Sequence, residues 1–155
     1  MSVGETLRTT SIRELRPLQP LCLEPQTRLS DALANMRSSK ASCVLVCEMG
    51  EVTGILTERD ILIKVAGEKI SLDSPIEQFM TPHPKVLTAN DRLSDAVLLM
   101  DAGDYRHVPI VDGSGRVEGI ISIHNVIEFL AEIFPEEVLN LPPRPNQSMT
   151  TQEGG

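Results

Sequence analysis

A chain of 155 residues has room for one compact domain or two very small ones. Its residues are 41% hydrophobic but only 3% aromatic, so the core is expected to be built from aliphatic side chains. The net charge of −8 argues against nucleic acid and anionic membranes as partners, because both need clustered Lys and Arg. The sequence has no apolar stretch near the roughly 20 residues of a membrane span and no signal-peptide pattern at its start. We therefore expect a cytosolic protein.

One unit is written twice along the chain. RLSDALANM at 28–36 matches RLSDAVLLM at 92–100 in six of nine positions, at an offset of 64. One residue is inserted in a later turn, after which GILTERDIL at 54–62 aligns with GIISIHNVI at 119–127 at an offset of 65. The repeat predicts two similar halves.

The repeats divide the chain into five segments. These are an N-terminal extension (1–11), a first repeat (12–68), a connector (69–75), a second repeat (76–134) and a C-terminal tail (135–155). The tail is rich in Pro and poor in large apolar residues, so we expect it to be disordered. A repeat of about 55 residues is too small to bury both faces of a sheet alone. The two repeats are therefore expected to stack their helix layers around one core, with pseudo-twofold symmetry.

Each repeat has the predicted order β-α-β-β-α, which gives an α+β fold in the form of an α/β sandwich. In the first repeat the elements are expected at 21–23, 28–36, 42–46, 52–56 and 57–66. In the second repeat they are expected at 85–87, 92–100, 107–111, 117–121 and 122–134. Thr27 and Asp91 precede the first helix of each repeat and are predicted to be its N-cap. Pro109 predicts that its strand begins near a sheet margin, because proline is tolerated mainly at edges and bulges.

The three cysteines, Cys22, Cys43 and Cys47, are an odd number, which fits a reducing compartment. Cys43 and Cys47 are four residues apart on a predicted strand, a distance of about 13 Å that no disulfide spans. We interpret them as small buried hydrophobic residues rather than as a redox or metal site.

The order of these elements, and GILTERD at the end of the third strand of the first repeat, resemble a tandem pair of CBS domains. MTPHPKVLTANDRLSDAVLLM at 80–100 looks like the start of a second CBS repeat, and YRHVPIVDGSGRVEGIIS at 105–122 looks like its strand pair. The resemblance covers 12–134. It implies a module with two clefts that bind adenosine-containing ligands such as AMP, ADP, ATP or S-adenosylmethionine, and it implies pairing of modules into a homodimer.

Thr57 and Asp60 lie three residues apart where a strand turns into a helix. A helix start gathers unpaired N–H groups and favours an anion, and a carboxylate can accept hydrogen bonds from the two hydroxyls of a ribose. By spacing alone the pair is better interpreted as a helix cap. The resemblance favours the other interpretation, because in CBS domains this Thr/Ser-x-x-Asp contacts ribose and phosphate.

Ser122 and Asn125 take the same two positions in the second repeat, but Asn125 brings no charge and one acceptor oxygen. Two unequal clefts are therefore expected. The cleft that uses Asp60 is predicted to bind a nucleotide more tightly than the cleft that uses Asn125.

Other candidate ligand-binding residues follow from the resemblance. Arg59, Arg106, His107 and His124 are candidates for phosphate contacts, although solvated surface positions explain Arg59 and Arg106 equally well and explain His124 better. The walls of the adenine slots are expected to include Cys22, Leu23, Cys43, Val44, Val86, Leu87, Thr88 and Pro109. Plain core packing would explain such apolar residues as well.

Two functions are compatible with these patterns. The first is a sensor that binds an adenosine nucleotide, AMP, ADP or ATP before S-adenosylmethionine, and acts in trans on an unidentified effector protein through a homodimer. The alternative is a structural dimerisation module with vestigial clefts. An enzyme is not expected, because no side chains converge as nucleophile and base, and neither a metal site nor a required cofactor is indicated.

Overall fold

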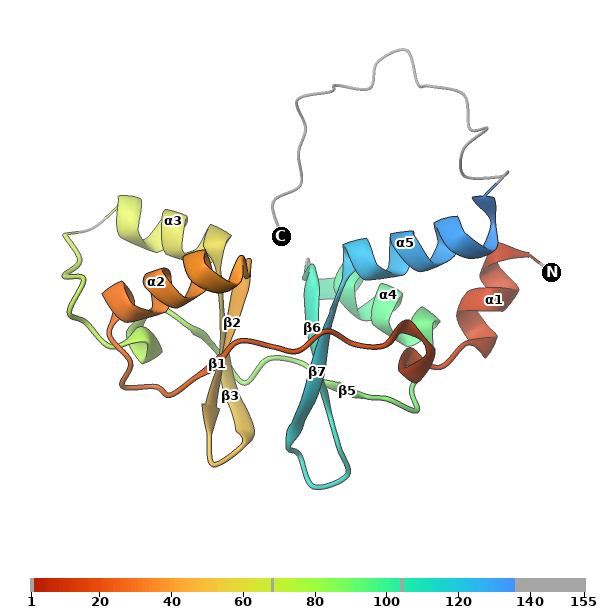
Figure 1. Ribbon diagram of the computed structural model, residues 1–155, viewed down its shortest axis with the longest axis horizontal. Coiled ribbons are helices and arrows are strands. Elements are labelled where there is room, and N and C mark those ends of the chain that lie inside the picture. Colours follow the sequence, from red (N-terminus) through yellow and green to blue (C-terminus); the bar gives the residue numbers. More distant parts are fainter. Residues whose placement is uncertain (1, 68, 104, 136–155) are drawn as a thin grey trace, which may run out of the picture.

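The computed structural model describes residues 2–67, 69–103 and 105–135, and the predicted tail from residue 136 onward lies outside the described residues. The fold is α+β, as predicted, with two similar halves (Figure 1). The first half contains β1 (Cys22–Leu23), α2 (Leu29–Ser39), β2 (Cys43–Glu48), β3 (Glu51–Thr57) and α3 (Glu58–Ala66). The second half contains β5 (Leu87–Thr88), α4 (Leu93–Gly103), β6 (His107–Val111), β7 (Val117–Ser122) and α5 (Ile123–Ile133).

Each half builds its own small sheet. In the first, β1 runs parallel to β2 and β2 pairs antiparallel with β3, and a fourth strand, β4 (Thr81–Pro82), pairs with the far edge of β3. In the second, β5 runs parallel to β6 and β6 pairs antiparallel with β7. A turn at Met49–Gly50 joins β2 to β3, with both residues at positive φ.

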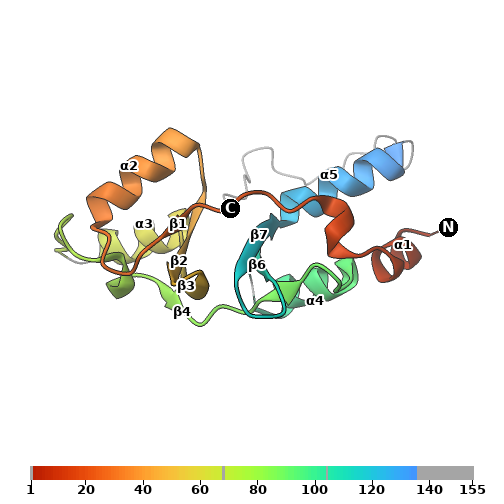
Figure 2. The ribbon, with the colours of Figure 1, turned by 60° about the horizontal axis from the view of Figure 1, so that its bottom comes forward.

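The two halves exchange the segments that precede their first strands. Leu18 forms a bridge with Ile120 of the second half, and the amide of Ile12 donates to the carbonyl of Asp91 at 2.8 Å. In return, β4 pairs with β3 of the first half, and the amide of Ile76 donates to the carbonyl of Thr27 at 2.8 Å. Figure 2 shows the two crossing segments on opposite sides of the molecule. Each sheet is therefore completed by the chain that leads into the other repeat.

Gly54 and Gly119, which begin the two aligned motifs, lie where the exchanged segments cross. A Cβ on Gly54 would lie within 2.2 Å of the sulfur of Met80. A Cβ on Gly119 would lie within 2.7 Å of the Cβ of Pro17. The absent side chains let the crossing backbone lie directly on the strand.

The core consists of three clusters, and the sheets rather than the helices meet at the centre. One cluster joins the first sheet to α2 and α3, and a second joins the other sheet to α4 and α5. The third lies between the sheets and includes Leu45 and Ile55 from the first half and Ile120 from the second. In Figure 1 the strands occupy the middle, with α2 and α3 on one side and α4 and α5 on the other. The expectation that helix layers stack around one core is therefore wrong. The contact between the two halves is made by the apolar faces of the two sheets that point away from the helices.

The N-terminal extension forms a helix, α1 (Val3–Thr9), that packs against α4 of the second half. The hydroxyl of Ser2 caps this helix by accepting from the amide of Glu5, and Thr6 is buried. A 3₁₀ turn, η1 (Ile12–Leu15), follows and places Ile12 in the second core cluster, while its counterpart η2 (Ile76–Gln78) places Ile76 in the first.

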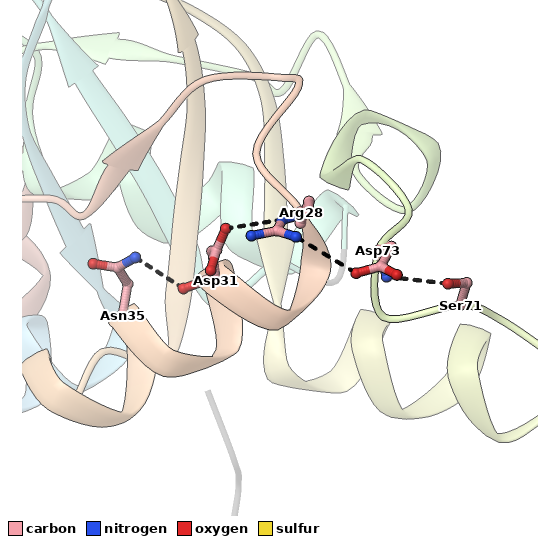
Figure 3. Close-up of polar contacts among 5 residues, drawn as sticks. All are labelled: Arg28, Asp31, Asn35, Ser71 and Asp73. Carbon is pink, nitrogen blue, oxygen red and sulfur yellow. Dashed lines mark hydrogen bonds and ion pairs between the residues drawn. The ribbon is translucent and has the colours of Figure 1, made fainter.

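The predicted N-caps Thr27 and Asp91 are each one residue too early. α2 begins at Leu29 with Arg28 as its N-cap, and no side chain caps it. Arg28 instead reaches Asp31 at 3.3 Å and Asp73 of the connector at 3.7 Å (Figure 3). In the second half, α4 begins at Leu93, and the carboxylate of Asp91 accepts from the amide and hydroxyl of Thr88. Asp91 thus stabilises the turn before the helix rather than the helix itself.

Pro109 lies in the central strand of its sheet and not at a margin, so this expectation is wrong as well. Proline is tolerated there because the amide and carbonyl of Ile120, its partner on β7, bond to Leu18 instead. In the first half, Leu45 donates its amide to the carbonyl of Leu21 at 2.8 Å. Pro109 takes the equivalent position and has no amide hydrogen. This loss explains why β5 begins only at Leu87, two residues later than predicted.

Candidate functional site

The aligned motifs both form capping boxes at a helix start. At α3 the hydroxyl of Thr57 accepts from the amide of Asp60 at 3.1 Å, and Oδ2 of Asp60 accepts from the amide of Thr57 at 3.3 Å. At α5 the hydroxyl oxygen of Ser122 accepts from the amide of Asn125 at 3.3 Å, and Oδ1 of Asn125 accepts from the amide of Ser122 at 2.8 Å. The cap predicted from spacing is therefore present in both halves.

The two caps leave different groups for a ligand. Asp60 uses Oδ2 in its cap, so Oδ1 is the carboxylate oxygen that the cap does not use. Asn125 has one oxygen, and that oxygen accepts from both the amide and the hydroxyl of Ser122. What Asn125 can offer a ligand is its NH₂ group, which is a donor. The first site can therefore accept hydrogen bonds from a ligand, whereas the second can donate them.

The first motif lies on a cavity of about 350 Å³ that is built from both halves. The first half contributes Ile55, Thr57, Arg59, Asp60 and Ile63. The second repeat contributes Thr81, Pro84, Lys85, Gly103, Tyr105, Arg106 and His107. We call this the first cleft. Among the described wall residues, three cationic side chains and one carboxylate surround a volume in the range of small-ligand sites.

The second motif lies on a related cavity of about 340 Å³, which we call the second cleft. Its walls are Leu18, Gln19, Pro20, Leu21, Ser39, Lys40, Ala41, Ser42, Cys43, Leu45, His107, Ile120, Ser122 and Asn125. Nine of these positions correspond to walls of the first cleft at the offsets of 64 and 65. The backbone repeats as well: Tyr105 donates its amide to the carbonyl of Met100, as Ala41 does to that of Met36. The two clefts are therefore related by the pseudo-twofold symmetry of the repeats.

His107 lies on the wall that the two clefts share, since it lines both. Its Nε2 atom lies 3.1 Å from the hydroxyl oxygen of Ser42, which also lines the second cleft. Burial lowers the pKa of His107 below 6.5, and the nearby His124 and Arg106 lower it further. The imidazole is therefore neutral at pH 7.

The predicted site residues divide between the clefts and other places. Thr57, Arg59, Asp60, Arg106 and His107 line the first cleft, and Cys43, Ser122 and Asn125 line the second. Cys22 and Leu23 line a third cavity. The remaining predicted residues, Val44, Val86, Leu87, Thr88, Pro109 and His124, line neither cleft, and Val44 and Pro109 are fully buried.

Sequence reasoning missed Lys85 and Tyr105 in the first cleft. Tyr105 lies against Gly103, where a Cβ would lie within 2.1 Å of the aromatic ring. The signal for Tyr105 was its position beside Arg106 and His107, which were already candidates. Lys85 precedes the strand predicted to line the adenine slot and was passed over in favour of its apolar neighbours.

The cysteines behave as predicted in part. Cys43 and Cys47 are buried, at 8% and 9% exposure, which confirms their packing role, and all three thiols are free. Cys22 is exposed on β1, and its thiol interacts with that of Cys47. Among the residues that the structure describes, no three His, Cys, Asp or Glu side chains are grouped to hold a metal ion, and no helix could cross a membrane.

The chain is thus a tandem-repeat module, in which two intertwined repeats form a pair of symmetry-related clefts between them. The CBS domain family model matches residues 12–67 and 76–132, so the chain belongs to the CBS domain family.

Curated proteins are similar in sequence to this chain over most of its length. An uncharacterized 17.7 kDa protein of Acidianus ambivalens is 30% identical over 125 residues, which are 80% of this chain and 75% of that protein. Other relatives are longer. The chain is 30% identical over 120 residues to the meiotically up-regulated gene 70 protein of Schizosaccharomyces pombe, which are 77% of this chain but 16% of that protein.

Solved structures share the fold. The CBS-domain protein ATU1752 of Agrobacterium tumefaciens has a TM-score of 0.71 and 30% identity, covering 77% of this chain and 98% of its own. PAE2072 of Pyrobaculum aerophilum, complexed with AMP, has a TM-score of 0.70 and 21% identity, covering 79% and 98%. The CBS pair of MJ0100, in complex with 5-methylthioadenosine and S-adenosyl-L-methionine, has a TM-score of 0.71 and 20% identity, covering 78% and 99%. At 20% and 21% identity, the similarity to the last two structures shows a shared fold.

Proposed function

We propose that this chain is a cytosolic sensor of AMP, ADP or ATP that acts in trans, through a homodimer, on an effector protein. The observation that carries the proposal is the composition of the first cleft, where Asp60 at a helix start is accompanied by Arg59, Lys85 and Arg106. The AMP complex of PAE2072 and the methylthioadenosine complex of MJ0100 support the ligand class. S-adenosylmethionine is a secondary candidate, and no catalytic role or required cofactor is part of the proposal.

In this proposal each part of a nucleotide has a partner in the first cleft. Ribose hydroxyls donate to Oδ1 of Asp60, and the phosphate lies against Arg106 and Lys85. The N-terminus of α3 adds a favourable field for the anion. Ile55 and Tyr105 provide the apolar surface that the flat faces of adenine require.

The homodimer rests on exposed apolar side chains of the outer helices. Leu62 of α3 is 70% exposed and Ile127 of α5, its counterpart at the offset of 65, is 53% exposed. Large apolar side chains exposed at corresponding positions of the two outer helices are candidates for an interaction surface. Analytical ultracentrifugation of wild type and of the Leu62→Glu/Ile127→Glu variant tests this, since the proposal requires a dimer that the variant loses. A monomeric wild type would contradict it.

A thermal-shift series with AMP, ADP, ATP and S-adenosylmethionine tests the ligand class. A ligand that binds only the folded state must raise the unfolding midpoint. At a ligand concentration one hundred times its Kd, the free energy of unfolding increases by about 2.7 kcal/mol. A shift with at least one adenosine phosphate is expected. The absence of any shift at millimolar concentrations would contradict the proposal.

Calorimetry of variants at the two motifs tests the ranking of the clefts. Asp60→Ala is expected to weaken AMP binding more than Asn125→Ala does. Asp60→Asn is the matched control, because it keeps an oxygen acceptor for the cap and replaces the charged oxygen that faces the ligand by an NH₂ donor, so weaker binding in this variant comes from the ligand contact rather than from a damaged helix start. Equal losses in Asp60→Ala and Asn125→Ala would refute the ranking.

The alternative, a structural module with vestigial clefts, is favoured by one observation. Both motifs form complete capping boxes, so the cap alone explains why these residue types stand at the two helix starts. Under this alternative, Asp60→Asn folds normally and no adenosine compound stabilises the protein.

A further inference from the structure

The two clefts have nearly the same volume but differ in charge at corresponding positions. Where the first cleft has Lys85, the second has Leu21, and where the first has Arg106, the second has Ser42. Among the described residues in the wall of the second cleft, Lys40 is the only charged side chain, because His107 is neutral at pH 7. The differences remove cationic groups from the places where the first cleft would hold phosphate.

The second cleft also lacks the aromatic side chain and the carboxylate that the first cleft has at corresponding positions. Tyr105 of the first cleft corresponds to Ala41 of the second, and Asp60 corresponds to Asn125. The oxygen of Asn125 already accepts two hydrogen bonds from Ser122, so the amide group presents a donor to the cleft. The second cleft is therefore a hydroxyl-rich cavity with Ser39, Ser42 and Ser122 in its walls, and among its described wall residues it has one cation, Lys40, against the three of the first cleft.

We propose that the clefts divide their ligands by charge, with a phosphate-bearing nucleotide in the first cleft and an uncharged nucleoside in the second. This inference rests on the proposed function and adds to it a ligand class for each cleft. A dianionic phosphate in the second cleft would lose its water without gaining the two cations that Lys85 and Arg106 supply in the first. An uncharged nucleoside avoids that cost and can still accept from Asn125 and exchange hydrogen bonds with the serine hydroxyls.

The test is calorimetric titration of the full chain with AMP and with adenosine, each at low and high salt. AMP is expected to bind one site with an affinity that falls as salt rises, because salt screens the attraction between its phosphate and the cations of the first cleft. Adenosine is expected to bind one site with little salt dependence, and to bind AMP-saturated protein with the same stoichiometry. If the two compounds compete for a single site, or if AMP fills both clefts with equal affinity and salt dependence, the division is wrong.

A reciprocal pair of variants assigns each site to its cleft. Arg106→Ser gives the first cleft the residue of the second and is expected to weaken AMP binding on the order of tenfold to a hundredfold, leaving adenosine unchanged. Ser42→Arg gives the second cleft the residue of the first and is expected to raise the AMP stoichiometry from one to two. Unchanged AMP binding in both variants would overturn the division while leaving the proposed function intact. No binding of AMP, ADP, ATP or adenosine by wild type would overturn both.

Discussion

The Nε2 atom of His107 lies 3.1 Å from the hydroxyl oxygen of Ser42, and this contact connects the two clefts across the interface of the repeats. His107 opens β6 in the second half, whereas Ser42 immediately precedes β2 in the first. Because the imidazole lines both cavities, a charge in either cavity affects its protonation state.

Acidification is expected to destabilise the protein through His107. Burial lowers the pKa of His107 in the folded state below its ordinary value of 6.5, so the unfolded chain binds more protons as the pH falls below 6.5. The free energy of unfolding should therefore decrease from pH 6.5 down to the lowered pKa. Urea denaturation across this range measures the slope. His107→Gln removes the titrating imidazole and should flatten the slope. Equal slopes in wild type and His107→Gln would contradict the assignment.

The capping boxes are expected to contribute to stability separately from any ligand. Thr57→Ala and Ser122→Ala each remove the acceptor for an amide at a helix start and should each cost about 1 kcal/mol in the free energy of unfolding. Thr57→Ser and Ser122→Thr keep the acceptor and serve as controls, with losses of a few tenths of a kcal/mol at most. Chemical denaturation without ligand is the measurement. If the Ala variants lose no more free energy of unfolding than the controls, the capping hydrogen bonds do not stabilise the helices.

The two glycines at the crossing points should differ in their tolerance of alanine. A Cβ on Gly119 meets the ring of Pro17 and the carbonyl of Leu18, neither of which can turn aside, and should cost about 1–3 kcal/mol. A Cβ on Gly54 meets the flexible side chain of Met80 and should cost less. Met80→Ala in the Gly54→Ala background removes the clash and should recover part of its cost, as denaturation midpoints would show. If Gly54→Ala is the more damaging change, the crossing geometry is different from that described.

Cys22 is expected to be the reactive thiol of the protein. Interaction with the thiol of Cys47 lowers the pKa of Cys22 to about 7, against a smaller opposing effect of burial. Alkylation by iodoacetamide, followed by peptide mass spectrometry, should therefore label Cys22 with a rate midpoint near pH 7. Burial raises the pKa of Cys43 to about 12, so Cys43 is the internal control that stays unlabelled. Cys47→Ala should move the midpoint for Cys22 upward. An unchanged midpoint in that variant would contradict the interaction.

Much of the fold could be predicted because the chain repeats itself. The offsets of 64 and 65 predicted the β-α-β-β-α order, and the helices lie close to their expected bounds. The exchange of segments could not be predicted, because the apolar character of Ile12 and Ile76 shows that they are buried but not against which sheet. The N-caps failed for a similar reason, since Asp91 finds its donors in Thr88 before the helix begins.

The site was predicted less completely than the fold. The motif residues Thr57, Asp60, Ser122 and Asn125 carry their own signal, and each lies on a cleft. The opposite walls come from the other half of the chain, so the alignment of repeats shows which residues correspond but not which ones meet. The apolar character of Val86 predicts an adenine contact, whereas in the structure its neighbour Lys85 lines the cleft.

A crystal structure of the protein grown with AMP tests the central claim most directly. The account predicts the nucleotide in the first cleft, with its ribose hydroxyls within hydrogen-bonding distance of Oδ1 of Asp60 and its phosphate facing Arg106. AMP bound with its ribose away from Asp60, or a first cleft that stays empty at saturating AMP, would contradict the claim.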